Sequence, residues 1–192
     1  LYKYRDSYIK QVPHSLGPES FALEKGTVYE PEAVIRDEAG AEIAEDFHIV
    51  FESDNEDVLK VDGDKIIAVK SGTVNLRASL GEISREVQVT VLDDLTSAEI
   101  KIKSLSNRTT IGIEEKTQLT GEILYNNIPV KGKTIVWESK HPHLASVDEN
   151  GYVTGVGEGK ARINAYVKND ENAESYIAIT VAQNVIGKVW TE

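Results

Sequence analysis

The sequence predicts an all-β protein built from two antiparallel sandwiches in tandem. Three observations predict this fold class: apolar residues alternate with polar ones along many short segments, turn residues separate these segments, and the whole pattern occurs twice. Alternation with a period of two places one face of a strand on a core and the other face in water. No helical stripe runs beyond a turn or two, so we expect strands throughout.

The repeat fixes the number of domains. Phe51-Glu52-Ser53 opens the first copy, and Trp137-Glu138-Ser139 opens the second copy 86 residues later. The separation becomes 87 residues between Gly72 and Gly159, after one extra residue in the second copy. Small changes confined to turns are expected of two copies of one fold, because loops absorb insertions and paired strands do not. The 192 residues therefore predict two domains, each large enough to bury its own core.

The strands can be placed in order along each copy. In the first copy we expect strands at residues 7–10, 21–23, 51–53, 58–62, 74–78 and 87–91. In the second copy we expect them at residues 97–102, 110–113, 137–139, 144–148, 161–165 and 177–181. Turn signals separate them, at residues 38–40, 62–64, 71–72, 126–127, 149–151 and 157–159.

These strands give the domain boundaries. We assign domain one to residues 1–93 and domain two to residues 94–183, with a tail at 184–192 that could open a third domain or dock on the second. The join at residues 92–95 is short and contains no run of glycine and serine. Such a join predicts a stiff arrangement with the domains end to end.

Composition excludes several classes of function. The net charge is −11, from 32 acidic and 21 basic residues, and an acidic surface repels phosphate backbones and anionic lipid. We therefore expect no nucleic-acid partner and no membrane insertion, and no apolar run is long enough to cross a bilayer. The lack of cysteine excludes disulfides, thiolate metal sites and a cysteine nucleophile. The sequence also lacks methionine, and we expect the translation start and any targeting signal to lie outside it.

The second copy resembles the bacterial Ig-like domain, group 2, of intimin- and invasin-like adhesins. The residues that carry the resemblance are Trp137-Glu138-Ser139, Leu144-Ala145-Ser146-Val147-Asp148, Asn150-Gly151, Val156-Gly157-Glu158-Gly159 and the strand at 161–165. The first copy is a weaker match, through Phe51-Glu52-Ser53, Val58-Leu59-Lys60-Val61-Asp62 and Val69-Lys70-Ser71-Gly72, and it lacks one turn glycine. The resemblance implies two tandem Ig-like antiparallel β-sandwiches. It implies little about function, because such folds serve as spacers, binders and virion or surface-layer modules.

The marked residues have physical roles of their own. Trp137 is expected to fill the space between the two sheets of domain two, with Phe51 as its counterpart in domain one. Gly151 follows Asn150, and this pair suits the positive φ angles of a tight hairpin turn. The glycines at 155, 157 and 159 could suggest a phosphate loop, but that chemistry needs a helix behind the loop, and strand patterns lie on both sides.

Candidate ion ligands are present without a recognised ligand spacing. His141-Pro142-His143 places two imidazoles close together, with Lys140 and Asp148 nearby rather than a metal-ligand set. Acidic residues gather at Asp54, Glu56, Asp57, Asp62 and Asp64, at Asp93-Asp94 and at Asn169-Asp170-Glu171-Asn172. We interpret them as solvated turns, since calcium takes six to eight oxygen ligands in a defined order. Asn107-Arg108-Thr109 is a formal glycosylation acceptor, and we interpret it as coincidental.

No catalytic, cofactor-binding or metal-binding residue is predicted, because the sequence contains no serine elbow, zinc helix motif or kinase-like set. The sequence favours a non-enzymatic structural or adhesion module, a rigid spacer of a bacterial cell-surface or surface-layer protein. Its expected partners are a protein or a cell-surface glycan and the neighbouring domains of a longer chain. A bacteriophage tail, fibre or capsid-decoration module is one alternative. Another is a carbohydrate-binding accessory domain of a secreted enzyme. Sugar binding usually needs a platform of exposed aromatic residues, and the sequence has only two tryptophans, Trp137, which is assigned to the core, and Trp190; the cluster of Tyr2, Tyr4 and Tyr8 keeps this alternative open.

Overall fold

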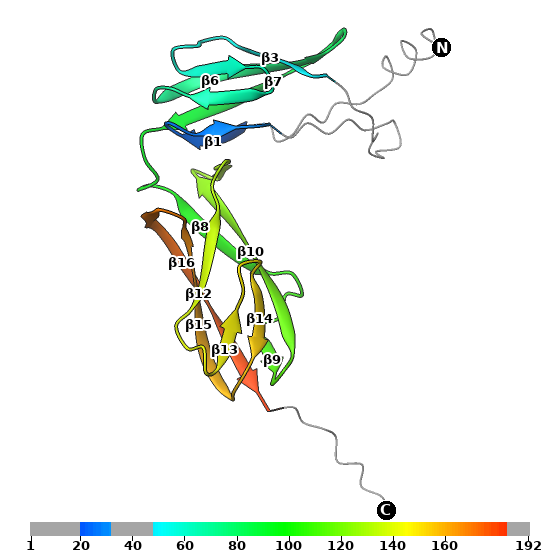
Figure 1. The fold of residues 1–192 in the computed structure, drawn as a ribbon, viewed down its shortest axis with the longest axis vertical. Helices are drawn as coiled ribbons and strands as arrows, with labels where there is room; N and C mark the ends of the chain where they lie inside the picture. The colour runs from blue at the N-terminus through cyan, green and yellow to red at the C-terminus, as the bar shows by residue number, and fades with distance from the viewer. Residues whose placement is uncertain (1–19, 32–47, 184–192) are drawn as a thin grey trace, which may run out of the picture. The chain divides into compact units, whose positions relative to one another are not determined.

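The computed structural model describes residues 20–31 and 48–183, and these ranges contain strands and no helix (Figure 1). The described residues therefore contain no helix that could span a membrane. The all-β prediction is confirmed. The chain divides into two compact units: unit 1 contains residues 1–95 and 127–132, and unit 2 contains residues 96–126 and 133–192. The expected strand at 7–10, the tail at 184–192 and the candidate aromatics Tyr2, Tyr4, Tyr8 and Trp190 lie outside the described residues.

Unit 1 consists of two sheets around one apolar core. The first sheet has the order β1 (Ser20–Glu24), β7 (Ile83–Leu92), β6 (Gly72–Leu80) and β3 (Val50–Ser53). The second has the order β2 (Val28–Tyr29), β5 (Lys65–Ala68) and β4 (Leu59–Asp62). The short strand β11 (Ile128–Pro129) groups with unit 1, in which the next residue, Val130, bridges Ala22. Both sheets contribute to the core, which contains Phe21, Leu23, Val58, Leu59, Ile66, Ala68, Val74, Leu76, Val87, Val89 and Val91.

Unit 2 has the same plan. One sheet has the order β12 (Ile135–Ser139), β15 (Gly159–Val167), β16 (Asp170–Ala182) and β9 (Thr110–Gly112). In the other sheet β10 (Lys116–Tyr125) lies between β8 (Glu99–Ser104) and β14 (Tyr152–Gly155), and β13 (Ala145–Val147) lies beyond β14. The core between them contains Ile111, Leu119, Ala145, Val153, Ala161, Ile163, Ile179 and Val181. This division of strands between two sheets is the one found in Ig-like sandwiches.

Each unit contains one pair of parallel strands among the residues that the structure describes. β1 pairs in parallel with β7, and β9 pairs in parallel with β16. In unit 2 the chain first pairs β8 with β10 and then crosses to the opposite sheet as β9. In each unit an early strand runs in the same direction as the last strand, so the two pair in parallel. The early strand thereby covers the edge of the sheet that the last strand would otherwise leave open.

The predicted faces of the longest strands are confirmed. In β6, Val74, Leu76 and Ala78 are buried, and in β15, Ala161, Ile163 and Ala165 are buried. The residues between them on β6 are exposed. On β15 the alternation fails at one position, Asn164, which is only 5% exposed although it lies on the outer face.

Phe51 and Trp137 lie at the margin of their cores. Both are half-buried, and each packs against the core cluster of its unit. The reason is topological: β3 and β12 are edge strands of their sheets, so an inward side chain there is covered on one side only. The prediction that these aromatics pack in the space between the sheets is correct, but they do not lie at its fully buried centre.

Candidate functional site

The two copies share a turn built by equivalent hydrogen bonds. In unit 2 the N–H of His141 donates to Ser139 Oγ at 3.2 Å, and the His141 carbonyl accepts the N–H groups of Leu144 and Ala145 at 2.9 and 3.0 Å. In unit 1 the N–H of Asn55 donates to Ser53 Oγ at 3.3 Å, and the Asn55 carbonyl accepts the N–H groups of the residues at 58 and 59. The serine that follows the aromatic residue in both copies therefore caps this turn.

His141 is part of that turn. Its Nδ1 accepts the backbone N–H of Arg162 at 3.2 Å, and its ring lies edge-on to the ring of His143, with 6.3 Å between centroids. Unit 1 has Asp54 in the neighbouring position, and its Oδ1 accepts the backbone N–H of Asn75 at 3.1 Å. Both side chains join the turn to the adjacent strand. Within residues 20–31 and 48–183, no three His, Cys, Asp or Glu side chains are grouped so that they could hold a metal ion.

The other acidic positions lie in turns. Asp148 Oδ1 accepts the N–H groups of Asn150 and Tyr152, each at 2.9 Å, and so closes the β13–β14 turn. Asp62 and Asp64 flank the glycine of the equivalent turn in unit 1, and both are exposed. Asn169 precedes Asp170 in the β15–β16 hairpin and has a φ of 65°. Asp93 and Asp94 lie between β7 and β8.

The glycine-rich segment is a turn between β14 and β15. A phosphate cradle needs free backbone N–H groups that converge on the ligand. Here the N–H of Gly155 donates to the Glu115 carbonyl at 3.0 Å, and the N–H groups of Val156 and Gly157 donate to the Leu144 carbonyl at 2.8 and 3.1 Å. The donors are already used, so the loop has a structural role.

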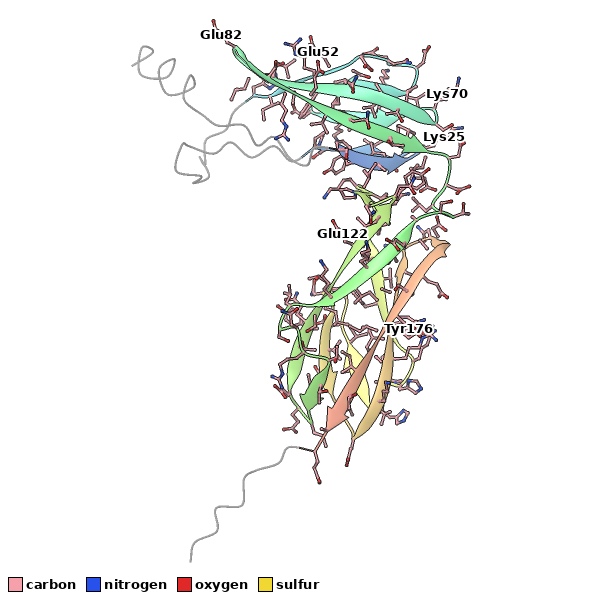
Figure 2. The ribbon with its side chains drawn as sticks, turned by 180° about the vertical axis from the view of Figure 1, so that it is seen from behind. Lys25, Glu52, Lys70, Glu82, Glu122 and Tyr176 are labelled. Carbon is pink, nitrogen blue, oxygen red and sulfur yellow. The ribbon has the colours of Figure 1, made fainter. Side chains whose placement is uncertain are left out.

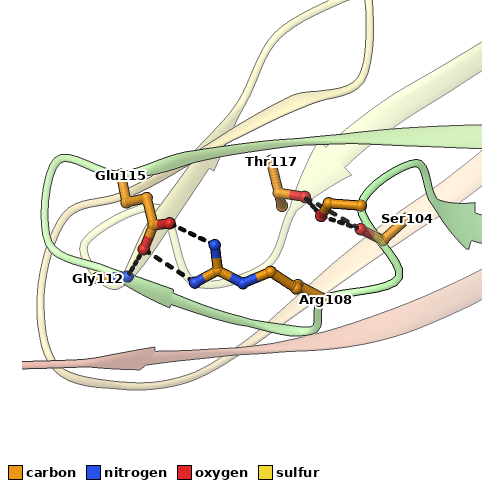
Figure 3. Close-up of polar contacts among 6 residues, drawn as sticks. Ser104, Arg108, Gly112, Glu115 and Thr117 are labelled. Carbon is orange, nitrogen blue, oxygen red and sulfur yellow. Dashed lines mark hydrogen bonds and ion pairs between the residues drawn. The ribbon is translucent and has the colours of Figure 1, made fainter.

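The formal glycosylation segment leads into an ion pair that the sequence reading missed. Arg108 Nη1 donates to Glu115 Oε1 at 2.7 Å, and Glu115 Oε2 accepts the Gly112 N–H at 2.7 Å (Figure 3). The Gly112 hydrogen bond, followed by the Arg108 contact, holds the pKa of the Glu115 carboxyl below its ordinary value. These contacts fix the turn between β9 and β10.

A second polar cluster in Figure 3 is a hydroxyl triangle of Ser104, Ser106 and Thr117. The three pairwise oxygen distances are 3.1, 3.0 and 3.0 Å. Ser104 and Thr117 are buried, so the triangle satisfies hydroxyl groups that would otherwise lie unpaired beside the core.

On the outer face of the sheet that contains β12, β15 and β16, an arginine lies over an aromatic ring. The guanidinium carbon of Arg162 lies 3.9 Å from the ring centroid of Tyr176, and Arg162 Nε donates to Asn164 Oδ1 at 2.8 Å. Tyr176 is 58% exposed and lies on β16, opposite Asn164 of β15 (Figure 2). Lys140, with its Nζ 2.7 Å from Glu138 Oε2, lies next to Arg162, because its N–H donates to the Arg162 carbonyl. A sequence reading could have noted that arginine and tyrosine face outward here, but their contact depends on the strand register.

The family model of the bacterial Ig-like domain, group 2, matches residues 96–177. The matched segment lies mostly in unit 2. The resemblance read from the motifs of the second copy is thereby confirmed, and the Ig-like sheet order of unit 2 agrees with it.

Two kinds of similar protein accompany this match. The polysaccharide lyase 8 family protein HylA of Enterococcus faecalis is 30% identical over 83 residues, which are 43% of this chain and 6% of that protein. Among solved structures, domains 5–6 of the S-layer protein SbsC are 14% identical, with a TM-score of 0.42, over 90% of this chain and 98% of that chain. The Yersinia pseudotuberculosis adhesin InvE is 13% identical, with a TM-score of 0.36, over 86% of this chain and 57% of that chain.

Proposed function

We propose that this chain is a non-enzymatic structural module, a stiff spacer within a longer protein of the bacterial cell surface. The observation that carries the proposal is the bacterial Ig-like domain at residues 96–177, joined to a second unit that has its own apolar core. The two units would be copies of one domain. Their matched sheet orders and the equivalent Ser53 and Ser139 turns support this.

The linker supports stiffness. Only residues 93–98 connect β7 to β8, and Leu95 within them is fully buried. A connection this short that contains no glycine is stiffer than a flexible Gly/Ser-rich linker. We propose the domain limits 1–93 and 94–183 on the same grounds, with the domains arranged end to end.

Small-angle scattering tests the spacer. A compact globule of this length has a radius of gyration of about 16 Å, and a rod must be clearly larger. As a matched control, a variant with a flexible Gly-Ser insertion between Asp93 and Asp94 should broaden the pair-distance distribution. A radius near the globular figure, or a distribution that the insertion leaves unchanged, would contradict a stiff end-to-end spacer.

One observation favours a second candidate, an accessory domain of a secreted polysaccharide-acting enzyme. The similar segment of HylA belongs to a protein named as a polysaccharide lyase and covers only 6% of it. A glycan array with the purified chain separates the two functions: selective binding supports the accessory domain, and absence of binding supports the spacer. The bacteriophage setting stays a prediction.

A further inference from the structure

We propose that the outer face of the β12–β15–β16 sheet binds acidic saccharides through a fixed arginine fork beside an exposed aromatic ring. The site consists of Arg162, Tyr176, Asn164, Lys140 and Lys160, here named the Arg162 patch. The ligand class is a uronic acid polysaccharide, whose carboxylate the guanidinium would bind. The inference goes beyond the spacer role, and it would give the accessory-domain candidate a binding site.

The first step is the orientation of Arg162. Its Nε is held by Asn164 Oδ1 at 2.8 Å, and its guanidinium lies on the Tyr176 ring, 3.9 Å from the centroid. These two contacts fix the plane of the group while its two Nη atoms stay available. Within the described part of the chain, the structure shows no ion pair for Arg162. An arginine fixed in this way loses little side-chain entropy when it forms a bidentate pair with a carboxylate.

The second step is the buried amide beneath it. Asn164 is 5% exposed on a strand face where alternation predicts an exposed residue. Arg162 and Tyr176 flank it, the first on the same strand and the second opposite it on β16. Among the described residues, the hydrogen bond of its side chain is the one that its Oδ1 accepts from Arg162 Nε. Burial of a polar side chain costs free energy unless it is satisfied, so this asparagine serves to position the arginine.

The third step is the aromatic surface. The guanidinium covers one face of the Tyr176 ring, yet the residue remains 58% exposed. The free part of an aromatic ring packs against the apolar face of a pyranose, and the phenol hydroxyl can form hydrogen bonds with sugar hydroxyls. A carboxylate attached to the same sugar ring would then reach the guanidinium next to it. This combination fits a uronate residue better than a neutral sugar.

The fourth step is local charge. Lys160 is exposed on the same strand face as Arg162, and Lys140 directly follows the neighbouring strand β12 and is paired with Glu138. The patch is therefore basic within a chain whose net charge is −11. Exposed charges farther away than about 8–10 Å are largely screened at physiological salt, so the distant acidic residues do not prevent an anion from binding here.

Unit 1 provides an internal comparison. Its equivalent cross-strand row contains Glu52, Arg77 and Glu86, where unit 2 has Glu138, Asn164 and Tyr176. Arg77 therefore lies between two carboxylates, and its Nη2 donates to Ser84 Oγ at 3.0 Å. At the position equivalent to Arg162, unit 1 has Asn75, whose Nδ2 donates to Asp54 Oδ2 at 3.0 Å. The same arrangement of strands therefore has a row of charged residues on its outer face in unit 1. In unit 2 it has an arginine that the described residues leave without an ion pair.

The test is a titration of the full chain with hexasaccharides of polygalacturonate, alginate and hyaluronan, followed by NMR amide shifts and calorimetry. At least one should bind, with shifts concentrated on β15 and β16, and its carboxyl methyl ester should bind at least tenfold more weakly. Arg162→Gln and Tyr176→Ala should each weaken binding at least tenfold. Arg162→Lys, which keeps the charge but not the planar fork, should also weaken it. The matched control Arg77→Gln removes one positive charge from unit 1 and should leave binding unchanged.

Several outcomes would overturn the proposal. The first is that none of the three hexasaccharides binds at millimolar concentration. The second is that Arg162→Gln binds as tightly as the unmodified chain. The third is that Arg77→Gln loses as much affinity as Arg162→Gln. Equal affinity for an acidic peptide would remove the saccharide assignment. Thermal melts of each variant establish that it is folded, and Arg162→Lys keeps the test valid if the glutamine variant fails to fold. Failure here leaves the spacer untouched, since scattering measures that role separately.

Discussion

Replacing Gly151 with alanine should destabilise unit 2 far more than the same change in an open turn. Gly151 has a φ of +77°, and a Cβ there would lie 2.5 Å from the Leu119 carbonyl oxygen and 3.2 Å from Trp137 Nε1. The left-handed backbone costs a non-glycine residue about 1–2 kcal/mol. Crowding against a backbone oxygen and a packed indole adds about 1–3 kcal/mol, so the expected loss in unfolding free energy is about 2–5 kcal/mol.

The matched control is Gly63→Ala in the equivalent turn of unit 1. Gly63 has a φ of +62°, and nothing lies within 4 Å of the position that its Cβ would take. This variant should therefore show only the backbone cost of about 1–2 kcal/mol. The difference between the two variants isolates the close approach of Gly151 to Leu119 and Trp137.

Calorimetry and urea unfolding measure both effects. A loss of 1 kcal/mol lowers the melting temperature of a domain this size by roughly 4–8 °C. In a Trp190→Phe background, Trp137 is the only tryptophan in the sequence, so indole fluorescence reports the unfolding of unit 2. Equal losses in Gly151→Ala and Gly63→Ala would refute the reasoning, because crowding would then contribute nothing.

Four further predictions follow from the same structure. Trp137→Ala should cost ~3–5 kcal/mol, toward the lower end because the indole is half-buried; an unshifted urea midpoint would contradict its packing role. The Glu115 pKa is lowered by the Gly112 hydrogen bond and then by Arg108, so its stabilising contribution is present at neutral pH and is lost as pH falls through the folded-state pKa. Glu115→Gln should therefore flatten the acid limb of a pH–stability profile, and identical acid limbs would count against this contact. Thr117→Val should cost about 1–3 kcal/mol by breaking the hydroxyl triangle, and a neutral effect would mean that the triangle adds no stability. Melts with calcium and with chelator should coincide, whereas a rise of ten degrees or more would reveal an ion site.

Local patterns were sufficient for the strand faces and turns. Val74 and Ile163 could be placed inward because alternation depends only on neighbouring residues in a pleated strand. The positive φ of Gly151 could be expected because Asn-Gly pairs suit tight turns. The repeat also placed Phe51 and Trp137 correctly between the sheets, although their position on edge strands, which sets their partial burial, depends on topology.

The polar contacts could not be predicted because they depend on register between strands. Arg162 and Tyr176 lie on different strands of one hairpin, and they meet because Asn164 pairs with Tyr176 across β15 and β16. The parallel pairing of β9 with β16 has the same origin, since alternation is identical in parallel and antiparallel strands. The ion pair of Arg108 with Glu115 depends on how the loops before and after β9 turn back toward each other.

The residues that identify the family are not the residues that would define a ligand. Ser139 caps a turn, Asp148 closes a hairpin, and Gly151 leaves room for Trp137, so each is explained by folding alone. A family signature made of such residues predicts a fold and leaves function open. Function is better sought where two copies of one frame differ at exposed positions, because the shared frame does not require those side chains. The change from Asn75 and Glu86 in unit 1 to Arg162 and Tyr176 in unit 2 is such a difference, and it therefore merits the first binding experiment.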